Sequence, residues 1–420
     1  MGKKTALAGF TASSAVSLTG NSVAAVALPL MQLAVTGDAL AAGFIAIACA
    51  VPQVLAGVLG GALLDRFNRR DISIASDVIS ALSIAALAVV DMTLGLSLEW
   101  FIALGILGAV GDIPGMTARD ALLPSAVERD GRDLQRFMGI YGAVQSLAVI
   151  IGPVLAAASM SALGYAGALW LTAGMSLAAA GITLLVPREA GRPSAAKETA
   201  RPKGSGGSPM AAAVRATVSS TAEGVRVLFA SSPVLRFSTG ATLAVVMVIG
   251  AVQGIVLPAF FDEQGTGDML GYVLSALSAG TLVGSLVYAQ FANRLGKRAW
   301  YALSILGMAA GMAVMCALHD YASIVVGSTV LGFFSGPVSA LLGYLAYEIV
   351  PDEQRGATLG TQNSLLLVAS PVAVFASAAL ISAYGVRAAA AALCAAWLAL
   401  SVYALAARSM RDLDRESDPQ

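Results

Sequence analysis

The chain has 420 residues, of which 57% are apolar and 12% charged. Soluble domains are about 45–50% apolar and about 25% charged, so this composition excludes a disordered protein and argues against an ordinary cytosolic enzyme. Lys plus Arg number 25 and Asp plus Glu also number 25. This zero net charge argues against nucleic acid as a partner, because nucleic-acid-binding proteins carry a basic surface.

Twelve continuous apolar segments follow one another along the chain. Each is long enough to cross about 30 Å of hydrocarbon as a helix. They cover residues 6–33, 39–63, 72–95, 100–122, 137–162, 165–187, 235–260, 269–291, 299–317, 322–347, 357–382 and 385–407. The first segment follows two lysines but is longer than the apolar core of a secretory signal, so we expect it to be retained. The sequence therefore predicts an all-α membrane protein with twelve transmembrane helices.

The basic residues divide unequally between alternate breaks in this pattern. If the N-terminus is cytoplasmic, 24 of the 25 Lys and Arg residues fall on the cytoplasmic side, and Arg387 alone falls outside. Cytoplasmic loops of membrane proteins carry an excess of Lys and Arg. The pattern predicts that both termini are cytoplasmic. It also supports the count of twelve spans, because a wrong count would distribute the basic residues over both sides of the membrane.

A polar segment rich in Pro, Gly and Ser, residues 188–209, divides six spans from six and predicts a flexible linker. The residues that follow it, 210–231, have a mildly amphipathic pattern typical of a surface helix. We therefore predict two six-helix bundles, a cytoplasmic linker with a surface helix, and a cytoplasmic tail. Their expected bounds are 1–187 and 233–408 for the bundles, 188–232 for the linker and 409–420 for the tail.

The two halves carry similar features in the same order. Residues 61–70, after the second span, correspond to residues 289–298, after the eighth, with an offset of 228 positions. Pro124 after span four and Pro351 after span ten are 227 positions apart. Parallel repeats of this kind are typical of transporters that bind substrate between the halves, near the middle of the membrane.

On these motifs the chain resembles the major facilitator superfamily of transporters over nearly its whole length. The family's motif after span two is Gly-x-x-x-Asp-Arg-x-Gly-Arg-Arg, and this sequence matches it at Gly61, Asp65, Arg66, Arg69 and Arg70. Asn68 stands where the family prefers Gly. Asn is the next best residue for a left-handed turn, so we expect the turn to be kept. The resemblance implies two pseudo-symmetric six-helix bundles.

These motif residues predict a cytoplasmic gate. Asp65 can accept hydrogen bonds from the N-terminus of a neighbouring helix, which the resemblance places near Gly356. The arginines of the motif can pair with carboxylates such as Asp120 or Asp77, or they can serve only to set the topology. A weaker copy of the gate is expected in the second half, at Asn293, Arg294, Lys297 and Arg298.

Span five carries part of the family's antiporter motif, Gly-x8-Gly-x3-Gly-Pro-x2-Gly-Gly. The sequence matches it at Gly139, Gly152 and Pro153. Three of its glycines are replaced by small residues, Ala148, Ala156 and Ala157. The motif implies export. The wording EGVRVLFASSPVLR before span seven, and ALLP at the end of span four, is similar to the drug, macrolide and enterobactin exporter branch.

Asp112 is the acid nearest the middle of a predicted span. A carboxylate at the bilayer centre costs about 2.5–3.5 kcal/mol on insertion scales, so we expect it to face a partner or an aqueous cavity. Burial favours the neutral form of a carboxyl group, which suits reversible protonation. Arg119 lies seven residues later on the same helical face and opposes that effect. The pair is predicted to serve proton coupling or substrate recognition, and a purely structural hydrogen bond or ion pair is the alternative.

Other polar residues inside spans are candidates for a substrate cavity, since spans one, four, seven and ten line it in the family. Asn21, Gln253 and Ser335 lie in spans one, seven and ten, and Gln53 and Gln145, in spans two and five, are further candidates. For each, an ordinary interhelical hydrogen bond is an equally good interpretation. A cavity with one carboxylate and few other charges suits an amphipathic or lipophilic substrate.

We therefore expect a monomeric, proton-coupled antiporter in a bacterial cell membrane that exports hydrophobic or amphipathic small molecules by alternating access. The alternatives are a solute importer of the same fold and a transport-inactive receptor or scaffold. The sequence has no zinc-peptidase, serine-hydrolase or phosphate-loop motif, so neither an enzyme nor an ATP-driven pump is expected. Three cysteines inside apolar runs and one loop histidine fit no metal site, so no metal or cofactor is expected.

Overall fold

The computed structural model describes residues 4–64, 67–131, 134–191, 225–230, 233–291, 294–349 and 352–406. Within these ranges the regular structure is helical, without a β-strand. Eleven of the described helices are long and apolar enough to cross a membrane. Large apolar side chains such as Leu82, Leu286 and Val402 are 60–67% exposed. Such outward-facing apolar side chains suit a protein surrounded by lipid, whose tails are as apolar as leucine.

Helix α5 (Leu134–Thr183) explains why eleven helices correspond to twelve predicted spans. It has 50 residues, which would measure about 75 Å as one straight helix, far more than the hydrocarbon core. Gly164 within it has φ 69° and ψ −172°, so two helices meet there at a sharp turn. The turn falls between the predicted spans 137–162 and 165–187. Helix α5 therefore contains both.

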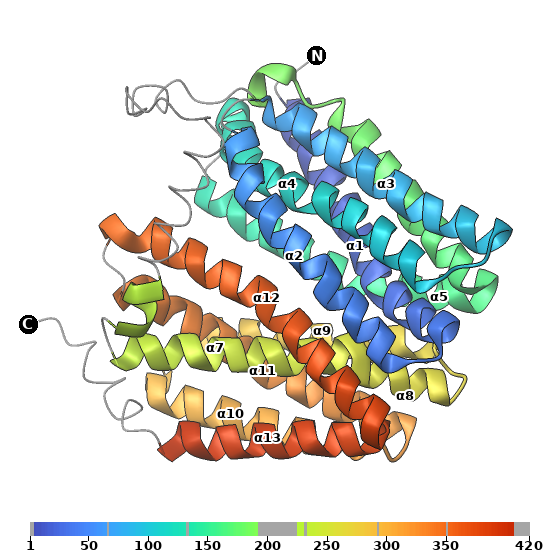
Figure 1. The fold of residues 1–420 in the computed structure, drawn as a ribbon. Helices are drawn as coiled ribbons and strands as arrows, with labels where there is room; N and C mark the ends of the chain where they lie inside the picture. The colour runs from blue at the N-terminus through green and yellow to red at the C-terminus, as the bar shows by residue number, and fades with distance from the viewer. Residues whose placement is uncertain are drawn as a thin grey trace, which may run out of the picture. The chain divides into compact units, whose positions relative to one another are not determined.

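The chain divides into two compact units, residues 1–36 with 47–217 and residues 37–46 with 218–420. The first unit contains α1 (Lys4–Thr36), most of α2 (Ala39–Leu64), α3 (Arg69–Thr93), α4 (Leu98–Asp130), α5 and the short 3-10 helix η1 (Arg188–Gly191). Within it, α1 packs along α5, and α3 packs against both α4 and α5 (Figure 1). Much of the predicted linker lies outside the described residues, so the predicted domain bounds stay a prediction.

The second unit holds the remaining described helices. They are α7 (Pro233–Ala251), the π-helical turn η3 (Val252–Val256), α8 (Leu257–Glu263), α9 (Met269–Phe291), α10 (Lys297–Cys316), α11 (Tyr321–Ile349), α12 (Asp352–Tyr384) and α13 (Val386–Ala406). Helix α7, η3 and α8 together form one apolar span. Helix α11 packs against α9 and α10, while α12 packs against α7 and α13.

Helices α9 and α11 approach so closely that their backbones touch. Each carries two glycines four residues apart, Gly280 and Gly284 in α9 and Gly332 and Gly336 in α11. A Cβ atom at Gly284 would lie 1.8 Å from the Phe333 carbonyl oxygen, so only glycine fits there. Small residues at this spacing drive helix packing in lipid, where apolar burial gives no advantage.

Six tight turns connect consecutive spans within the described residues. Five of them contain a glycine with positive φ, at Gly37, Gly95, Gly164, Gly265 and Gly385. The sixth contains Leu318, whose φ is 46°. A left-handed residue of this kind ends a helix and reverses the chain within a few residues. These six turns are the ones that the charge pattern predicts to lie outside the cell.

Candidate functional site

Helix α3 has a polar face that is buried inside the first unit. This face is formed by Ser73, Ser76, Asp77, Ser80 and Ser83, none of them more than 5% exposed. Their spacing of three and four residues places them on one side of the helix, and α3 packs against α4 and α5. Because buried polar groups require partners, this face brings specific polar contacts into the interior of the unit.

The central contact is an ion pair between Asp77 and Arg119 of α4, whose side chains are 4% and 6% exposed. The Arg119 guanidinium donates to Oδ1 of Asp77. The Ser17 hydroxyl of α1 donates to the same oxygen at 3.0 Å. Within the described part of the chain, Asp77 Oδ2 and Arg119 Nε have no hydrogen-bond partner. The pair therefore joins three helices and still has unused hydrogen-bonding capacity on both sides.

Asp112 lies beside this ion pair. It stands about two turns before Arg119 on α4 and is partly buried. The Ser80 hydroxyl of α3 donates a hydrogen bond to its carboxylate, and the charges of Arg119 and Asp77 act on the same group. We refer to Asp77, Asp112 and Arg119 as the charged cluster. In it, Arg119 is paired with Asp77, and Asp112 lies close enough for both charges to act on it.

The structure brings together the two residues that the sequence singled out, Asp112 and Arg119, but gives Arg119 a different partner. From the sequence, we expected Asp77 only as a possible partner of the gate arginines. Its pairing with Arg119 was not predicted. The signal was present in the serines that recur with Asp77 at helical spacing along one face of α3.

The gate arginines Arg69 and Arg70 donate to backbone carbonyl groups, and the carboxylate that pairs with Arg70 is its neighbour Asp71, at 3.4 Å, rather than Asp120 or Asp77. Arg69 donates to the Ala121 carbonyl of α4 at 2.9 Å. Arg70 donates to the carbonyls of Thr183 and Leu184, at 3.3 and 2.7 Å, where α5 ends. A cation at a helix C-terminus is favoured by the helix dipole. Arg70 thus joins α3 to the end of α5, and Arg69 joins α3 to α4, whereas Asp77 is already paired with Arg119.

Asn68 departs from the expected left-handed turn. Its backbone is extended, with φ −68° and ψ 123°, and its side chain caps α3. Its Oδ1 accepts from the Arg70 backbone N–H at 3.0 Å, and its Nδ2 donates to the Arg188 carbonyl at 2.7 Å. Arg188 in turn pairs with Asp71 at 2.8 Å. Asparagine serves here as the N-cap of α3, a position at which it is among the preferred residues. Its side chain also connects η1 to α3.

The other gate residues are described only in part. Gly61 lies near the end of α2, while Asp65, Arg66 and Asn293 lie outside the described residues. In the second unit, the Arg294 guanidinium lies 4.9 Å from the centre of the Phe291 ring. Helix α10 begins with Lys297 and Arg298. The gate role of all these residues stays a prediction.

The antiporter motif lies where α5 packs on α1. A Cβ atom at Gly152 would lie 2.2 Å from Cβ of Ser22 and 3.1 Å from the Thr19 carbonyl oxygen. Only glycine allows this approach, and Pro153 beside it is also buried. Gly139 lies earlier in α5, and its surroundings fall outside the described contacts. The motif therefore marks a close helix contact in the first unit.

The remaining polar candidates fall into two groups. Ser335 is buried and shares a hydrogen bond with Thr281 of α9 at 3.2 Å, which favours the interhelical interpretation for this residue. The others are partly or fully accessible. They are Asn21 and Gln53, which are partly buried, Gln145, which is exposed and hydrogen-bonds Tyr141, and Gln253, which lies in the π-helical turn η3. Single π-turns inside helices are frequent at functional sites.

An all-helical membrane fold with repeated halves and a buried charged cluster is characteristic of a transporter. The model of the Major Facilitator Superfamily matches residues 10–261 and 239–419. The chain therefore belongs to this superfamily of multi-pass membrane transporters and is not an enzyme. The fold class predicted from the sequence is confirmed.

Named relatives and solved structures agree with this assignment. The chain is 31% identical to the multidrug efflux pump Tap of Mycolicibacterium fortuitum over 409 residues, which are 95% of each chain. It is 29% identical to Tap of Mycobacterium tuberculosis over 401 residues, covering 94% of this chain and 91% of the relative. The crystal structure of the nucleoside transporter NupG superposes with a TM-score of 0.75 at 12% identity, covering 97% and 99% of the two chains. At that identity the likeness concerns the fold alone.

Proposed function

We propose that this protein is a proton-coupled exporter of hydrophobic or amphipathic small molecules in a bacterial cell membrane. The direction of transport is supported by the similarity to efflux pumps named Tap, which extends over nearly the whole of both chains. The proton coupling is supported by the charged cluster in the first unit. A buried ionisable residue inside a membrane span is costly and typically belongs to an ion or substrate pathway.

The chemistry of the cluster suggests how a proton is exchanged for substrate. While Asp112 is protonated and neutral, Arg119 stays paired with Asp77 as the structure has it. When Asp112 loses its proton, a second carboxylate competes for the same guanidinium. Because Asp77 and Arg119 each have an unused polar atom, Arg119 can divide its hydrogen bonds between the two acids. Protonation of one residue thereby changes the contacts between α3 and α4.

The remaining polar residues fit a substrate with few charges. In the first unit, Asn21 and Gln145 offer amide groups, which donate and accept hydrogen bonds without a fixed charge. An amphipathic molecule can occupy an apolar cavity and use these groups for orientation. A cationic substrate is also attracted by Asp112 in its ionised form. Binding of such a molecule and binding of a proton at Asp112 exclude each other, which is the requirement for antiport.

Transport by Asp112→Asn in reconstituted liposomes tests this proposal. Asparagine keeps the size and polarity of the residue but cannot release a proton. We expect accumulation of ethidium driven by a pH gradient to fall to the level of protein-free liposomes. Exchange of labelled for unlabelled ethidium without a gradient is expected to persist, because exchange requires substrate binding and alternating access but no proton.

Glu99→Gln is the matched control, since Glu99 is an exposed acid in the first turn of the same helix. It is expected to transport like the unmodified protein. Full dependence on the pH gradient in Asp112→Asn would refute the role of Asp112. Loss of both gradient-driven transport and exchange would refute it as well, because that result indicates a binding residue without a coupling role.

A further inference from the structure

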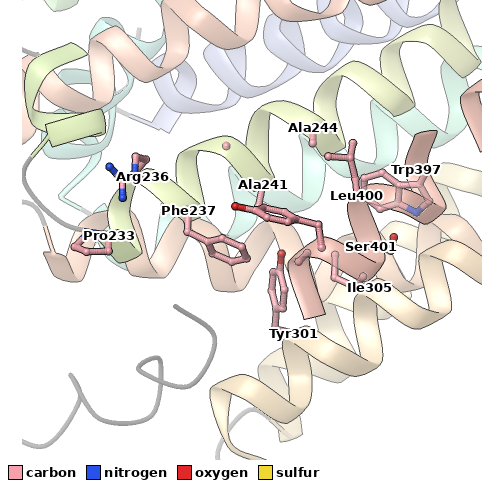
Figure 2. Close-up of a pocket in the computed structure, with 13 residues that line it drawn as sticks. Pro233, Arg236, Phe237, Ala241, Ala244, Tyr301, Ile305, Trp397, Leu400 and Ser401 are labelled. Carbon is pink, nitrogen blue, oxygen red and sulfur yellow. The ribbon is translucent and has the colours of Figure 1, made fainter. Parts of the chain in front are cut away.

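A cavity of about 540 Å³ lies within the second unit, between α7, α10 and α13. Figure 2 shows Arg236 at one end of it, Phe237 and Tyr301 in the middle, and Leu400 and Trp397 toward the other end. None of its residues belongs to the charged cluster or the gate motifs. The transport mechanism proposed above therefore leaves this cavity without a role.

Three residues that line the cavity each carry a buried polar atom that has no hydrogen-bond partner within the described part of the chain. Within the described residues, no hydrogen bond satisfies the Tyr301 hydroxyl, Nε1 of Trp397 or Oγ of Ser401. These residues are only 1%, 2% and 4% exposed. A buried polar group without a partner costs about 1–3 kcal/mol, so a ligand that forms hydrogen bonds with these three groups would be bound more tightly. The indole N–H can only donate, and the ligand must therefore present acceptor oxygens.

Arg236 indicates that the ligand carries a negative charge. Its side chain is exposed at the mouth of the cavity, and no carboxylate of the described chain pairs with it. Between Arg236 and the buried donors the lining is aromatic and aliphatic, with Phe237, Ile305 and Leu400. The ligand therefore combines an anionic group, further acceptor oxygens and a hydrocarbon portion.

The position of the cavity indicates a lipid. Helices α7 and α10 begin near it and α13 ends near it, which is the side that the charge pattern predicts to be cytoplasmic. Basic pockets between transmembrane helices on that side bind anionic head groups. We propose that this cavity binds one anionic phospholipid. Its phosphate contacts Arg236, its ester oxygens accept from the buried donors, and an acyl chain lies against Phe237 and Leu400.

Native mass spectrometry of the full-length protein in detergent tests this proposal. The protein is freed of lipid and titrated separately with phosphatidylglycerol, phosphatidylcholine and oleate. We expect phosphatidylglycerol to bind at the lowest concentration, with one molecule retained per protein. Arg236→Gln is expected to weaken that binding about fivefold, the effect of one basic residue near an anionic lipid. Arg226→Gln removes another exposed arginine, outside the cavity, and is expected to bind like the unmodified protein.

A second variant fills the cavity without touching its charge. A Cβ atom at Gly240 meets nothing within 4 Å, so Gly240→Leu places a side chain in the cavity without a backbone clash. It is expected to abolish retention of the lipid. Gly174→Leu in α5 is the control, because the Cβ position of Gly174 is equally open. Unchanged phosphatidylglycerol binding in both Arg236→Gln and Gly240→Leu would overturn the proposal. Equal binding of phosphatidylcholine or oleate, or equal weakening by Arg226→Gln, would also overturn it.

Discussion

At the scale of single residues, the two acids of the charged cluster differ in how they are held. Asp77 is almost fully buried and has a cation and a hydroxyl as partners. Asp112 is less buried and has a hydroxyl partner in Ser80. Asp77 is joined directly to the Arg119 guanidinium, whereas Asp112 lies beside this ion pair. In the proposed mechanism, Asp77 therefore has a structural role and Asp112 the coupling role.

The structural role of Asp77 predicts a large loss of stability in Asp77→Ala. Removing Asp77 takes away the carboxylate that is paired directly with the buried Arg119, and breaking a buried pair in this way costs about 3–5 kcal/mol. Thermal unfolding in detergent is expected to show a clear drop in melting temperature. In the double variant Asp77→Ala with Arg119→Leu, part of that loss is expected to be recovered, because the buried guanidinium that lost its partner is then absent as well.

Asp71→Ala provides the comparison. Asp71 pairs with Arg188, whose side chain is 71% exposed, and exposed pairs contribute only about 0–1 kcal/mol. We expect little change in its melting temperature. If Asp77→Ala unfolds at the same temperature as Asp71→Ala, the buried pair does not hold the first unit together.

Residue-level patterns predicted part of the candidate site. Asp112 was identifiable because a lone acid in the middle of an apolar run has no explanation in loops or topology. The partner of Arg119 was not identifiable from the sequence, because Asp77 lies near the end of its apolar run. Pairing across α3 and α4 also depends on the orientation of each helix about its own axis, which a linear pattern does not give. Asn68 was recognised as a turn residue, but its cap on α3 depends on contacts with η1 that a linear pattern does not contain.

At the scale of helices, glycine spacing decides how closely neighbours pack. Lipid tails are as apolar as leucine side chains, so burial of apolar surface does not drive helices together in a membrane. Helices associate there because their backbones can approach each other closely. The glycine pairs of α9 and α11 provide this in the second unit, and Gly152 provides it between α1 and α5 in the first.

Gly284→Ala is therefore expected to destabilise the second unit. The added methyl group would meet the Phe333 carbonyl oxygen, and the two helices would have to move apart. Such overpacking typically costs about 1–3 kcal/mol. The expected result is a lower melting temperature in detergent. Gly240→Ala is the control, since its Cβ position is open, and it is expected to be neutral or slightly stabilising. Equal stability of the two variants would contradict the close packing of α9 and α11.

The order of the spans was predictable because it follows from apolar length alone. Even the turn at Gly164 inside α5 falls at the predicted boundary between two spans. The π-helical turn at Val252–Val256 was not predictable, because its residues are as apolar as their neighbours. Its presence depends on packing against α12, where Gly250 and Gly254 lie against Ser370 and Val374.

At the scale of the whole molecule, the two sides of the protein differ in chemistry. Nearly all Lys and Arg residues lie in the breaks and termini that are predicted to be cytoplasmic. The opposite connections are tight turns with positive φ, which have little room for charged loops. On the predicted topology, the zero net charge of the chain therefore conceals a strong separation of positive charge between the two sides of the membrane.

Cysteine labelling tests this orientation. Leu94 and Phe67 are 73% and 58% exposed and lie on opposite sides of the predicted topology. In a background without the three native cysteines, we expect Leu94→Cys to react with a membrane-impermeant maleimide on intact cells. Phe67→Cys is expected to react only after the membrane is permeabilised. The reverse pattern would show that the protein is inserted with its termini outside.

The central claim is that Asp112 exchanges a proton for substrate, and proton release on substrate binding tests it most directly. Purified protein in weakly buffered detergent solution, with a pH-sensitive dye, is mixed with ethidium. The unmodified protein is expected to release protons in proportion to the substrate bound. Asp112→Asn is expected to bind substrate without releasing them, while Glu99→Gln releases them normally. Proton release of the same size from Asp112→Asn would contradict the account.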